Sequence, residues 1–385
     1  MTEWRSALAD CQMITGVPRA DGDDADRRTR AALAAAVVAA HGALVGVPRP
    51  PGGRGRLVLS WLRRPAEERI RVVVAGVPTS PPGRQGGRVL WPPGALSEPV
   101  AASDVTEWWQ EHPYWVRCAG GDQVPAWGES GGDARVTSLD AMADWDHVVT
   151  LGRPFGWVVV AEPIPSDRLE AEIVRWRTHL GLLRAKATSE SHQVDLERGR
   201  RRFRELVTAR AGGLWDVHVL AGGLSPADAR LVASLLSHAV SAQPSPLVLV
   251  PDSHAGPLDE AWRRTVAGPD GTTSPFTAGG ETVARLAPPP SREVPGVRSL
   301  VPPRFDLTPE VSGDIVLGRV VDETFHDVGA FGVTPETVNR HVFVCGATGS
   351  GKSQTTRQLL ESLARADPPV PWLVVEPVKA EYAAT

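Results

Sequence analysis

A phosphate-binding motif near the end of this 385-residue sequence constrains its fold more than any other feature. Residues 346–353 read Gly-Ala-Thr-Gly-Ser-Gly-Lys-Ser and fit the pattern G-x-x-x-x-G-K-[ST] at every fixed position. The apolar run 342–345 precedes the motif, and a helix-compatible stretch, 354–366, follows it. A strand, a glycine loop and a helix in this order form the setting in which the pattern binds phosphate. The sequence therefore predicts a P-loop nucleotide site.

The residue types of this motif suit the binding of ATP and Mg²⁺. Glycines let the backbone bring its N–H groups to a phosphate, and the start of the following helix adds unpaired donors and the positive end of its dipole. Lys352 is expected to reach the β- and γ-phosphates, and the hydroxyl of Ser353 to contact Mg²⁺. The residues expected to bind ATP are Gly346, Ala347, Thr348, Gly349, Ser350, Gly351, Lys352, Ser353 and Gln354. The structural alternative is a glycine-rich turn without a ligand.

Hydrolysis of ATP requires further groups, and the sequence offers one candidate. A second strand has to end in a carboxylate that holds Mg²⁺ through water, and another group has to orient the attacking water. Residues 372–376 form the one further expected strand, and Glu376 ends it. Glu376 is thus the single catalytic candidate, with an exposed strand-end carboxylate or an ion pair as the alternative. No complete catalytic set is present, so the chain is not expected to be active alone.

Composition and cysteine usage indicate a cytoplasmic protein of two or three domains. The net charge of −4 argues against a protein that coats nucleic acid along its whole surface, although a local basic surface is compatible with it. Cys11, Cys118 and Cys345 show no disulfide or metal spacing, which suits a reducing compartment. The ten histidines are scattered, and no structural metal is expected. The apolar stretch 31–47 is short and rich in alanine, so a buried helix is expected there instead of a membrane span.

The apolar patterns divide the chain into four parts. Residues 1–148 are expected to form an α/β region with a helix at 28–44, strands at 57–62 and 70–74 joined as a hairpin, and a loop at 81–93. Residues 150–252 are expected to form an α/β sandwich, with a ferredoxin-like fold as one option. Residues 253–313 are rich in proline and glycine and are expected to be a surface linker with a short helix at 280–286. Residues 314–385 form an incomplete P-loop ATPase domain.

The second of these parts has the clearest pattern. Strands are expected at 157–161, 214–220 and 247–250. Between the first two strands, an apolar stripe at three- and four-residue steps predicts a helix from Ser166 to about Arg210, with a break near residues 189–192. A second helix is expected at 226–241, with Ser225 as its cap.

The residues around the motif resemble the HerA/FtsK superfamily of P-loop ATPases, in particular its HerA-like and conjugative type IV secretion branches. Residues 340–353 carry Arg-His upstream of the strand and Thr-Gly-Ser-Gly-Lys-Ser in the loop, as these proteins do. Residues 376–382 (EPVKAEY) are similar to the acidic residue, proline, lysine and glutamate that follow the P-loop helix there. Glu376 departs from the usual Asp. Residues 315–320 resemble the strand that leads into these domains, and residues 281–296 a linker of the secretion branch.

This resemblance implies an α/β protein in which N-terminal α/β domains precede the beginning of a RecA-like ATPase core. It implies a homohexameric ring with nucleotide between subunits, and a motor that moves DNA in the manner of a translocase or helicase. This chain is then the N-terminal part of such a motor, because the Walker B strand and sensor residues lie beyond the match. Three alternatives are a secretion-type ATPase that moves protein or DNA, a partner-docking module in residues 1–310 with a vestigial ATPase segment, and a P-loop enzyme of another lineage such as a kinase.

Two further features have a functional and a structural interpretation. Five arginines crowd one stretch, namely Arg198, Arg200, Arg201, Arg202 and Arg204. They are interpreted either as a phosphate-contacting patch or as a solvated helix face, and the flanking acids Glu197 and Glu205 favour the second. The thirteen tryptophans are interpreted as core residues more readily than as stacking platforms for single strands, because basic residues do not alternate with them.

Overall fold

The computed structural model describes Leu8 and residues 10–19, 34–41, 56–76, 79–83, 86–122, 152–186, 189–241, 247–268, 272–290, 293–300, 313–321 and 327–375. The chain divides into two compact units, Met1–Leu300 and Val301–Thr385. The first unit is a mixed α/β structure built on one large sheet, which confirms the predicted α/β class.

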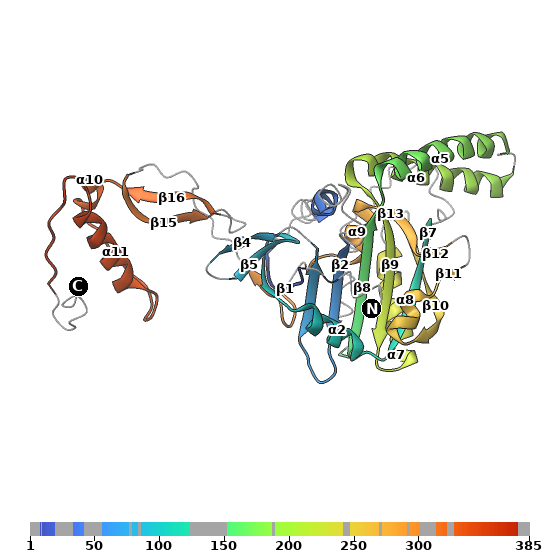
Figure 1. The fold of residues 1–385 in the computed structure, drawn as a ribbon, viewed down its shortest axis with the longest axis horizontal. Helices are drawn as coiled ribbons and strands as arrows, with labels where there is room; N and C mark the ends of the chain where they lie inside the picture. The colour runs from blue at the N-terminus through green and yellow to red at the C-terminus, as the bar shows by residue number, and fades with distance from the viewer. Residues whose placement is uncertain are drawn as a thin grey trace. The chain divides into compact units, whose positions relative to one another are not determined.

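Among the described strands, the sheet of the first unit is antiparallel except for the parallel pair β1 and β14. Its main path runs β11-β12-β7-β9-β8-β2-β3-β1-β6-β5-β4, and β10, β13 and β14 pair with β7, β9 and β1 (Figure 1). The strands are β1 (Gln12–Pro18), β2 (Leu57–Arg63), β3 (Ile70–Ala75), β4 (Thr79–Gly83), β5 (Gly86–Leu90), β6 (Pro93–Pro99), β7 (Tyr114–Asp122), β8 (Phe155–Pro163), β9 (Leu214–Gly223), β10 (Leu247–Gly256), β11 (Val266–Ala267), β12 (Thr273–Ser274), β13 (Phe276–Gly279) and β14 (Arg298–Leu300).

Alternate strand residues point to opposite sides of the sheet, and residues of both sides are apolar here. Helices therefore cover both faces. On β9, Val217 and Val219 join a core under α7, α9 and the helix at residues 34–41, whereas Leu220 joins a second core under α2 and α8. The helices of this unit are α2 (Ala102–Gln110), α5 (Ser166–Lys186), α6 (Glu190–Gly212), α7 (Pro226–Ser241), α8 (Leu258–Arg263) and α9 (Gly280–Leu286). Within the predicted helix at 28–44, residues 34–41 are described and are helical.

Most of the strongly patterned segments form the predicted elements. β2 and β3 pair as the expected hairpin, and β8, β9 and β10 extend the predicted strands at their ends. The side chain of Ser225 accepts a hydrogen bond from the backbone N–H of Asp228 at 3.1 Å, so Ser225 caps α7 as predicted. The predicted break near residue 189 separates α5 from α6, and Ser189 caps the second helix by accepting from the N–H of His192.

α5 and α6 pack side by side as a helical hairpin at one end of the sheet (Figure 1). The predicted apolar stripe holds them together, since Leu169 and Ile173 of α5 pack with Leu206 and Ala209 of α6. Gly199 permits this approach further along, because a Cβ there would lie within 3.0 Å of Leu180 and Leu183. Leu214, at the start of β9, joins the same cluster and fixes the base of the hairpin to the sheet.

Two predicted irregular segments of the first unit are structured instead. Residues 81–93 were expected to be a loop, but they contribute to β4, β5 and β6. β4 ends the path of the sheet, and an edge strand tolerates proline because one side of its backbone needs no partner. The expected linker holds β11 to β14 and α9, and it contributes Phe276, Val283 and Val297 to the main core.

The pairing also crosses the expected division near residue 150. β7 lies before that position and β8 after it, and both pair with β9 in the same sheet. Strands from the expected first, second and linker regions therefore share one hydrogen-bonded sheet in unit Met1–Leu300. The ferredoxin-like arrangement of residues 150–252 stays a prediction.

The second unit contains a hairpin and the predicted P-loop helix. Its elements are β15 (Ile315–Val321), β16 (Asp327–Val333), α10 (Pro335–Val338) and α11 (Lys352–Ala364). Leu359 and Leu363 of α11 pack against Ile315 and Val333 of the hairpin. β15 confirms the predicted strand at 315–320.

Two predicted strands are not formed in the part of this unit that the structure describes. Residues 342–345 and 372–375 have no regular secondary structure, and Phe343 is 90% exposed. Each of these apolar runs is typical of a central strand, which requires hydrogen-bonded neighbours on both sides. Neither segment has such a neighbour among the described residues, so neither adopts a strand. Across both units, no helix of the described residues combines the length and the apolar composition needed to cross a membrane.

Candidate nucleotide-binding site

The phosphate-binding motif forms an exposed loop that leads directly into α11. The helix begins at Lys352, and Gly351 is its N-cap residue, with a left-handed backbone at φ 86°. Gly349 is also left-handed, at φ 81°. Only glycine adopts this region without a steric penalty, so the two glycines permit the turn that places the loop over the end of the helix.

Two hydrogen bonds to one carbonyl oxygen hold the loop in shape. The backbone N–H of Ser350 donates to the carbonyl oxygen of Ala347 at 3.2 Å, and the Lys352 Nζ donates to the same oxygen at 2.6 Å. A Cβ on Gly346 would lie 2.4 Å from the Ser350 hydroxyl oxygen, so a larger residue at position 346 would displace that hydroxyl. The lysine ammonium is therefore held at the mouth of the loop.

The loop fits an anionic ligand. The first intrahelical hydrogen bond of α11 runs from the N–H of Thr355 to the carbonyl of Gly351, so the preceding N–H groups of the turn are the ones a helix leaves for a ligand. No acidic residue lies in the first turn, and the Lys352 ammonium adds positive charge there. A Cβ at Gly349 or Gly351 would meet no atom within 4 Å, which shows that the space above the loop is open.

The structure brings all nine predicted ATP-binding residues together in this loop and the first turn of α11. Ser353 is exposed, at the second position of the helix, where the expected Mg²⁺ ligand belongs. Glu376 lies outside the described residues, as does the rest of the stretch 376–382, so its role stays a prediction. Among the described residues, no cluster of three or more His, Cys, Asp or Glu side chains is arranged to hold a metal ion.

Comparison with protein families supports the assignment drawn from the loop. Residues 315–385 match the family described as the helicase HerA central domain. This segment is HerA/FtsK-like. The match begins at β15 and includes the whole P-loop, so the residues that carry the resemblance and the residues of the site coincide. No curated protein matches the chain.

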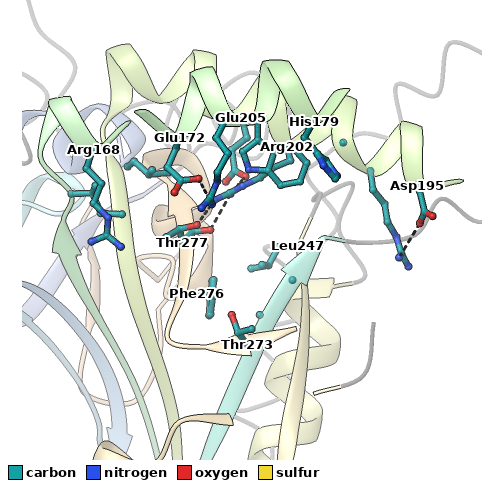
Figure 2. A pocket seen from close by; sticks show the side chains of 18 of the residues that line it. Arg168, Glu172, His179, Asp195, Arg202, Glu205, Leu247, Thr273, Phe276 and Thr277 are labelled. Atoms are coloured by element: carbon teal, nitrogen blue, oxygen red, sulfur yellow. Dashed lines mark hydrogen bonds and ion pairs between the residues drawn. The ribbon is translucent and has the colours of Figure 1, made fainter. Parts of the chain in front are cut away.

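A second candidate site is a cleft of about 840 Å³ between the helical hairpin and the sheet. Figure 2 shows charged side chains of α5 and α6 pointing into the space above Leu247, Phe276 and Thr273. Trp176, Leu183 and Leu214 add apolar surface to the lining. Sequence analysis missed this cleft because residues 168–205 form one side and the separate segments 120–121, 247 and 273–277 contribute the other. The signal available was the charged residues of α5 beside the predicted apolar stripe, since Trp176 and Leu183 of that stripe also line the cleft.

The arginines of the cleft are paired with carboxylates. Arg168, Arg175, Arg198 and Arg202 lie 2.5–3.9 Å from Asp216, Glu172, Asp195 and Glu205, respectively. Arg202 also donates to the carbonyl oxygen of Thr277 at 3.1 Å, and the Glu205 carboxylate accepts from the N–H of Gly279 at 2.8 Å. These last contacts connect α6 to β13. The cleft is thus nearly neutral in charge, and the arginine run is divided between ion pairs and exposed positions.

Proposed function

We propose that this chain is an ATP-binding protein and the N-terminal portion of a HerA/FtsK-like motor that translocates or unwinds DNA. The match of residues 315–385 to the HerA central domain, which includes an open loop at the start of α11, carries the proposal. A RecA-like core and a homohexameric ring are part of the proposal because they belong to this superfamily.

The loop residues have distinct roles in this proposal. The N–H groups of Gly349 and residues 351–353 hold the phosphates, and the Lys352 ammonium exchanges the carbonyl oxygen of Ala347 for the β- and γ-phosphate oxygens. The Ser353 hydroxyl holds Mg²⁺, which neutralises charge on the phosphates when it is bound. Gln354 follows in the same turn. Glu376 is proposed to contact the metal or its water, and hydrolysis requires groups beyond these.

Removal of the Lys352 ammonium tests nucleotide binding. A hydrogen bond to a charged group contributes about 1.5–3 kcal/mol, so Lys352→Ala is expected to weaken ATP binding by about tenfold to a hundredfold. Titration with a fluorescent ATP analogue in the presence of Mg²⁺ measures the affinity. Lys186→Ala removes the same side chain from α5 and serves as the matched control. Equal affinity of the Lys352→Ala variant and the unaltered protein would refute the proposal.

The substance that the motor moves distinguishes a DNA motor from a secretion-type ATPase. A DNA motor hydrolyses ATP faster when DNA is present, whereas an ATPase that exports protein responds to its protein substrate. A steady-state ATPase assay with and without duplex DNA, on protein that contains the entire ATPase domain, distinguishes the two. Stimulation that is lost in Lys352→Ala supports the DNA motor, and hydrolysis that is indifferent to DNA supports the secretion-type alternative.

A further inference from the structure

The helical hairpin α5–α6 carries a charge opposite to that of the rest of the chain. Residues 166–212 contain eleven Arg and Lys residues and seven Asp and Glu residues, a net charge of +4. The whole chain has a net charge of −4, so the remainder carries −8. Such a separation of charge makes this one element a candidate surface for a polyanion.

Only part of this positive charge is neutralised within the hairpin. Most of the arginines that line the cleft or cross between the helices have carboxylate partners, and Arg210 makes two hydrogen bonds of 2.7 Å to Glu170. No ion pair or hydrogen bond with the described residues is made by Arg184, Arg201 or Arg204. Arg177 interacts with Glu170 through electrostatic attraction, without a hydrogen bond. Arg177, Arg184 and Arg204 are exposed, and Arg201 is partly exposed.

These four arginines lie outside the cleft, on the remaining surface of the hairpin. Arg177 and Arg184 are seven residues apart on α5, which places them on one face about 10 Å apart along the axis. Arg201 and Arg204 are three residues apart on α6 and are neighbours on its surface. The two pairs belong to helices that pack against each other, so both lie on one structural element, the α5–α6 hairpin. Several guanidinium groups spread over one element suit a ligand with repeated anionic groups.

We infer that the outer surface of the α5–α6 hairpin, through Arg177, Arg184, Arg201 and Arg204, contacts the phosphate backbone of a nucleic acid. The contact is independent of base sequence because guanidinium groups that bind phosphate do not read base edges. This inference adds a DNA contact to the proposed motor and rests on that function for its biological role. The physical basis is separate from the P-loop, since it lies entirely in the charges of unit Met1–Leu300.

Three double variants with the same change in net charge test the inference. Arg177→Gln/Arg184→Gln and Arg201→Gln/Arg204→Gln each remove two charges from the hairpin. Arg69→Gln/Arg298→Gln removes two exposed arginines elsewhere in the first unit, outside any ion pair of the described residues, and is the matched control. Fluorescence anisotropy with a labelled DNA duplex, without nucleotide and at several salt concentrations, measures the affinity. Circular dichroism verifies that each variant keeps the helical content of the unaltered protein.

Each hairpin variant is expected to bind DNA about tenfold more weakly near 0.1 M salt. The slope of log K against log salt is expected to fall by about 1 to 2 in each, because about 0.9 of that slope arises from each neutralised phosphate. The control variant is expected to keep the affinity and slope of the unaltered protein. An equal loss in all three variants would show that net charge alone matters, and no loss in the hairpin variants would show that the surface is not used. Either result overturns the inference.

Two further measurements distinguish this inference from binding of an acidic polypeptide and from the proposed function. Polyglutamate, at the same concentration of negative charge, is expected to compete only weakly with the labelled DNA. If it competes as effectively as unlabelled DNA, the inference that the ligand is a nucleic acid is overturned in favour of an acidic polypeptide.

Lys352→Ala is expected to keep the DNA affinity that the unaltered protein has without nucleotide. If Lys352→Ala still binds ATP while the hairpin variants lose DNA, the proposed function fails and the hairpin contact stands. If ATP binding depends on Lys352 but the hairpin variants keep DNA affinity, the inference fails alone.

Discussion

At the scale of single residues, the glycines of the P-loop determine the shape of the proposed anion site. Gly351 has a φ of 86° and stands at the start of α11, yet a Cβ there would touch no atom within 4 Å. A substitution at this position is therefore unfavourable through backbone strain alone and not through a clash. A Gly351 variant therefore tests the shape of the loop, whereas a Lys352 variant tests its charge.

Gly351→Ala is expected to weaken ATP binding by about fivefold to thirtyfold. An L-residue in the left-handed region raises the conformational free energy by about 1–2 kcal/mol. The loop of the variant relieves this strain by leaving the conformation that presents its N–H groups, and ATP affinity falls by the corresponding factor. Gly318→Ala, in β15, also introduces a methyl group into open space but at an ordinary φ, and it serves as the control. Titration with the fluorescent ATP analogue measures both. Equal affinities of the two variants would show that the left-handed turn is unimportant for binding.

A buried arginine and a histidine form the second residue-scale feature. The Arg117 guanidinium is buried and donates to the Ser274 hydroxyl at 2.6 Å and to the Ala261 carbonyl oxygen at 3.0 Å. It also donates to Nδ1 of His218 at 2.5 Å, and the ring of His218 stacks on Trp262 with centroids 4.5 Å apart. Burial, followed by the charges of Arg117 and Arg56, lowers the pKa of His218 to about 3.

His218 should make the first unit less stable in acid. Its folded-state pKa of about 3 lies below the usual value of 6.5, so stability from the neutral ring is present above pH 6.5 and is lost as the pH falls toward 3. Between pH 6.5 and about pH 5 this corresponds to a loss of about 2 kcal/mol. His218→Gln, whose amide oxygen can still accept from Arg117, is expected to show a shallower decline. Urea unfolding at several pH values measures it, and parallel pH profiles of both proteins would contradict the assignment.

At the scale of elements, two glycines make room for a tryptophan between three strands. Gly156 of β8 pairs with Gly222 of β9, which in turn pairs with Trp115 of β7. A Cβ on Gly156 would lie 2.7 Å from the indole of Trp115, and one on Gly222 would lie 2.9 Å from it. The fully buried indole thus rests directly on the backbone of two neighbouring strands.

Gly156→Val is expected to destabilise the first unit by about 1–3 kcal/mol, because an overpacked core forces side chains or backbone to shift. Gly181→Ala, at an open position within α5, is the control and is expected to stabilise by about 0.5–1 kcal/mol. Urea unfolding followed by tryptophan fluorescence measures both. Combination of Gly156→Val with Trp115→Leu should recover part of the loss, and strictly additive effects would show that the indole is not the source of the clash.

The elements that sequence reasoning predicted are those with a local cause. The stripe of α5, the cap of α7 at Ser225 and the glycine loop before α11 each depend on residues close together in the sequence. The elements it missed or misassigned depend on distant partners. β4 contains two prolines and has no apolar alternation, and it is a strand because β5 pairs with it. Conversely, residues 342–345 have a strand composition but no strand partner among the described residues.

The same distinction applies to the sites. The nine residues proposed to bind ATP could be named from the sequence because the P-loop is a continuous motif whose chemistry depends on its own backbone. The cleft and the basic outer surface of the hairpin required the structure, because they depend on which arginines find carboxylates. Arg198, Arg200 and Arg202 pair with acids within α6, whereas Arg201 and Arg204 in the same run do not. Each of the three paired arginines has an acid three residues away, and Arg201 and Arg204 have none, so helical spacing accounts for this division once the helix is known.

At the scale of the whole molecule, the two units are expected to unfold separately. The first unit has its own two-faced core, to which the segment near Val294 and Val297 contributes, and it ends at Leu300. Twelve of the thirteen tryptophans lie within it, and only Trp372 belongs to the second unit. Tryptophan fluorescence therefore reports almost entirely on the first unit.

A chain that contains residues 1–312 alone is expected to fold and to show the same urea midpoint by tryptophan fluorescence as the full chain. The reason is that, within the part of the chain that the structure describes, the core clusters of the first unit consist of residues before position 301. ATP with Mg²⁺ is expected to leave this midpoint unchanged in both chains, because a ligand stabilises only the unit that binds it. A lower midpoint for the shorter chain, or an ATP-dependent shift of the tryptophan transition in the full chain, would show that the two units unfold cooperatively.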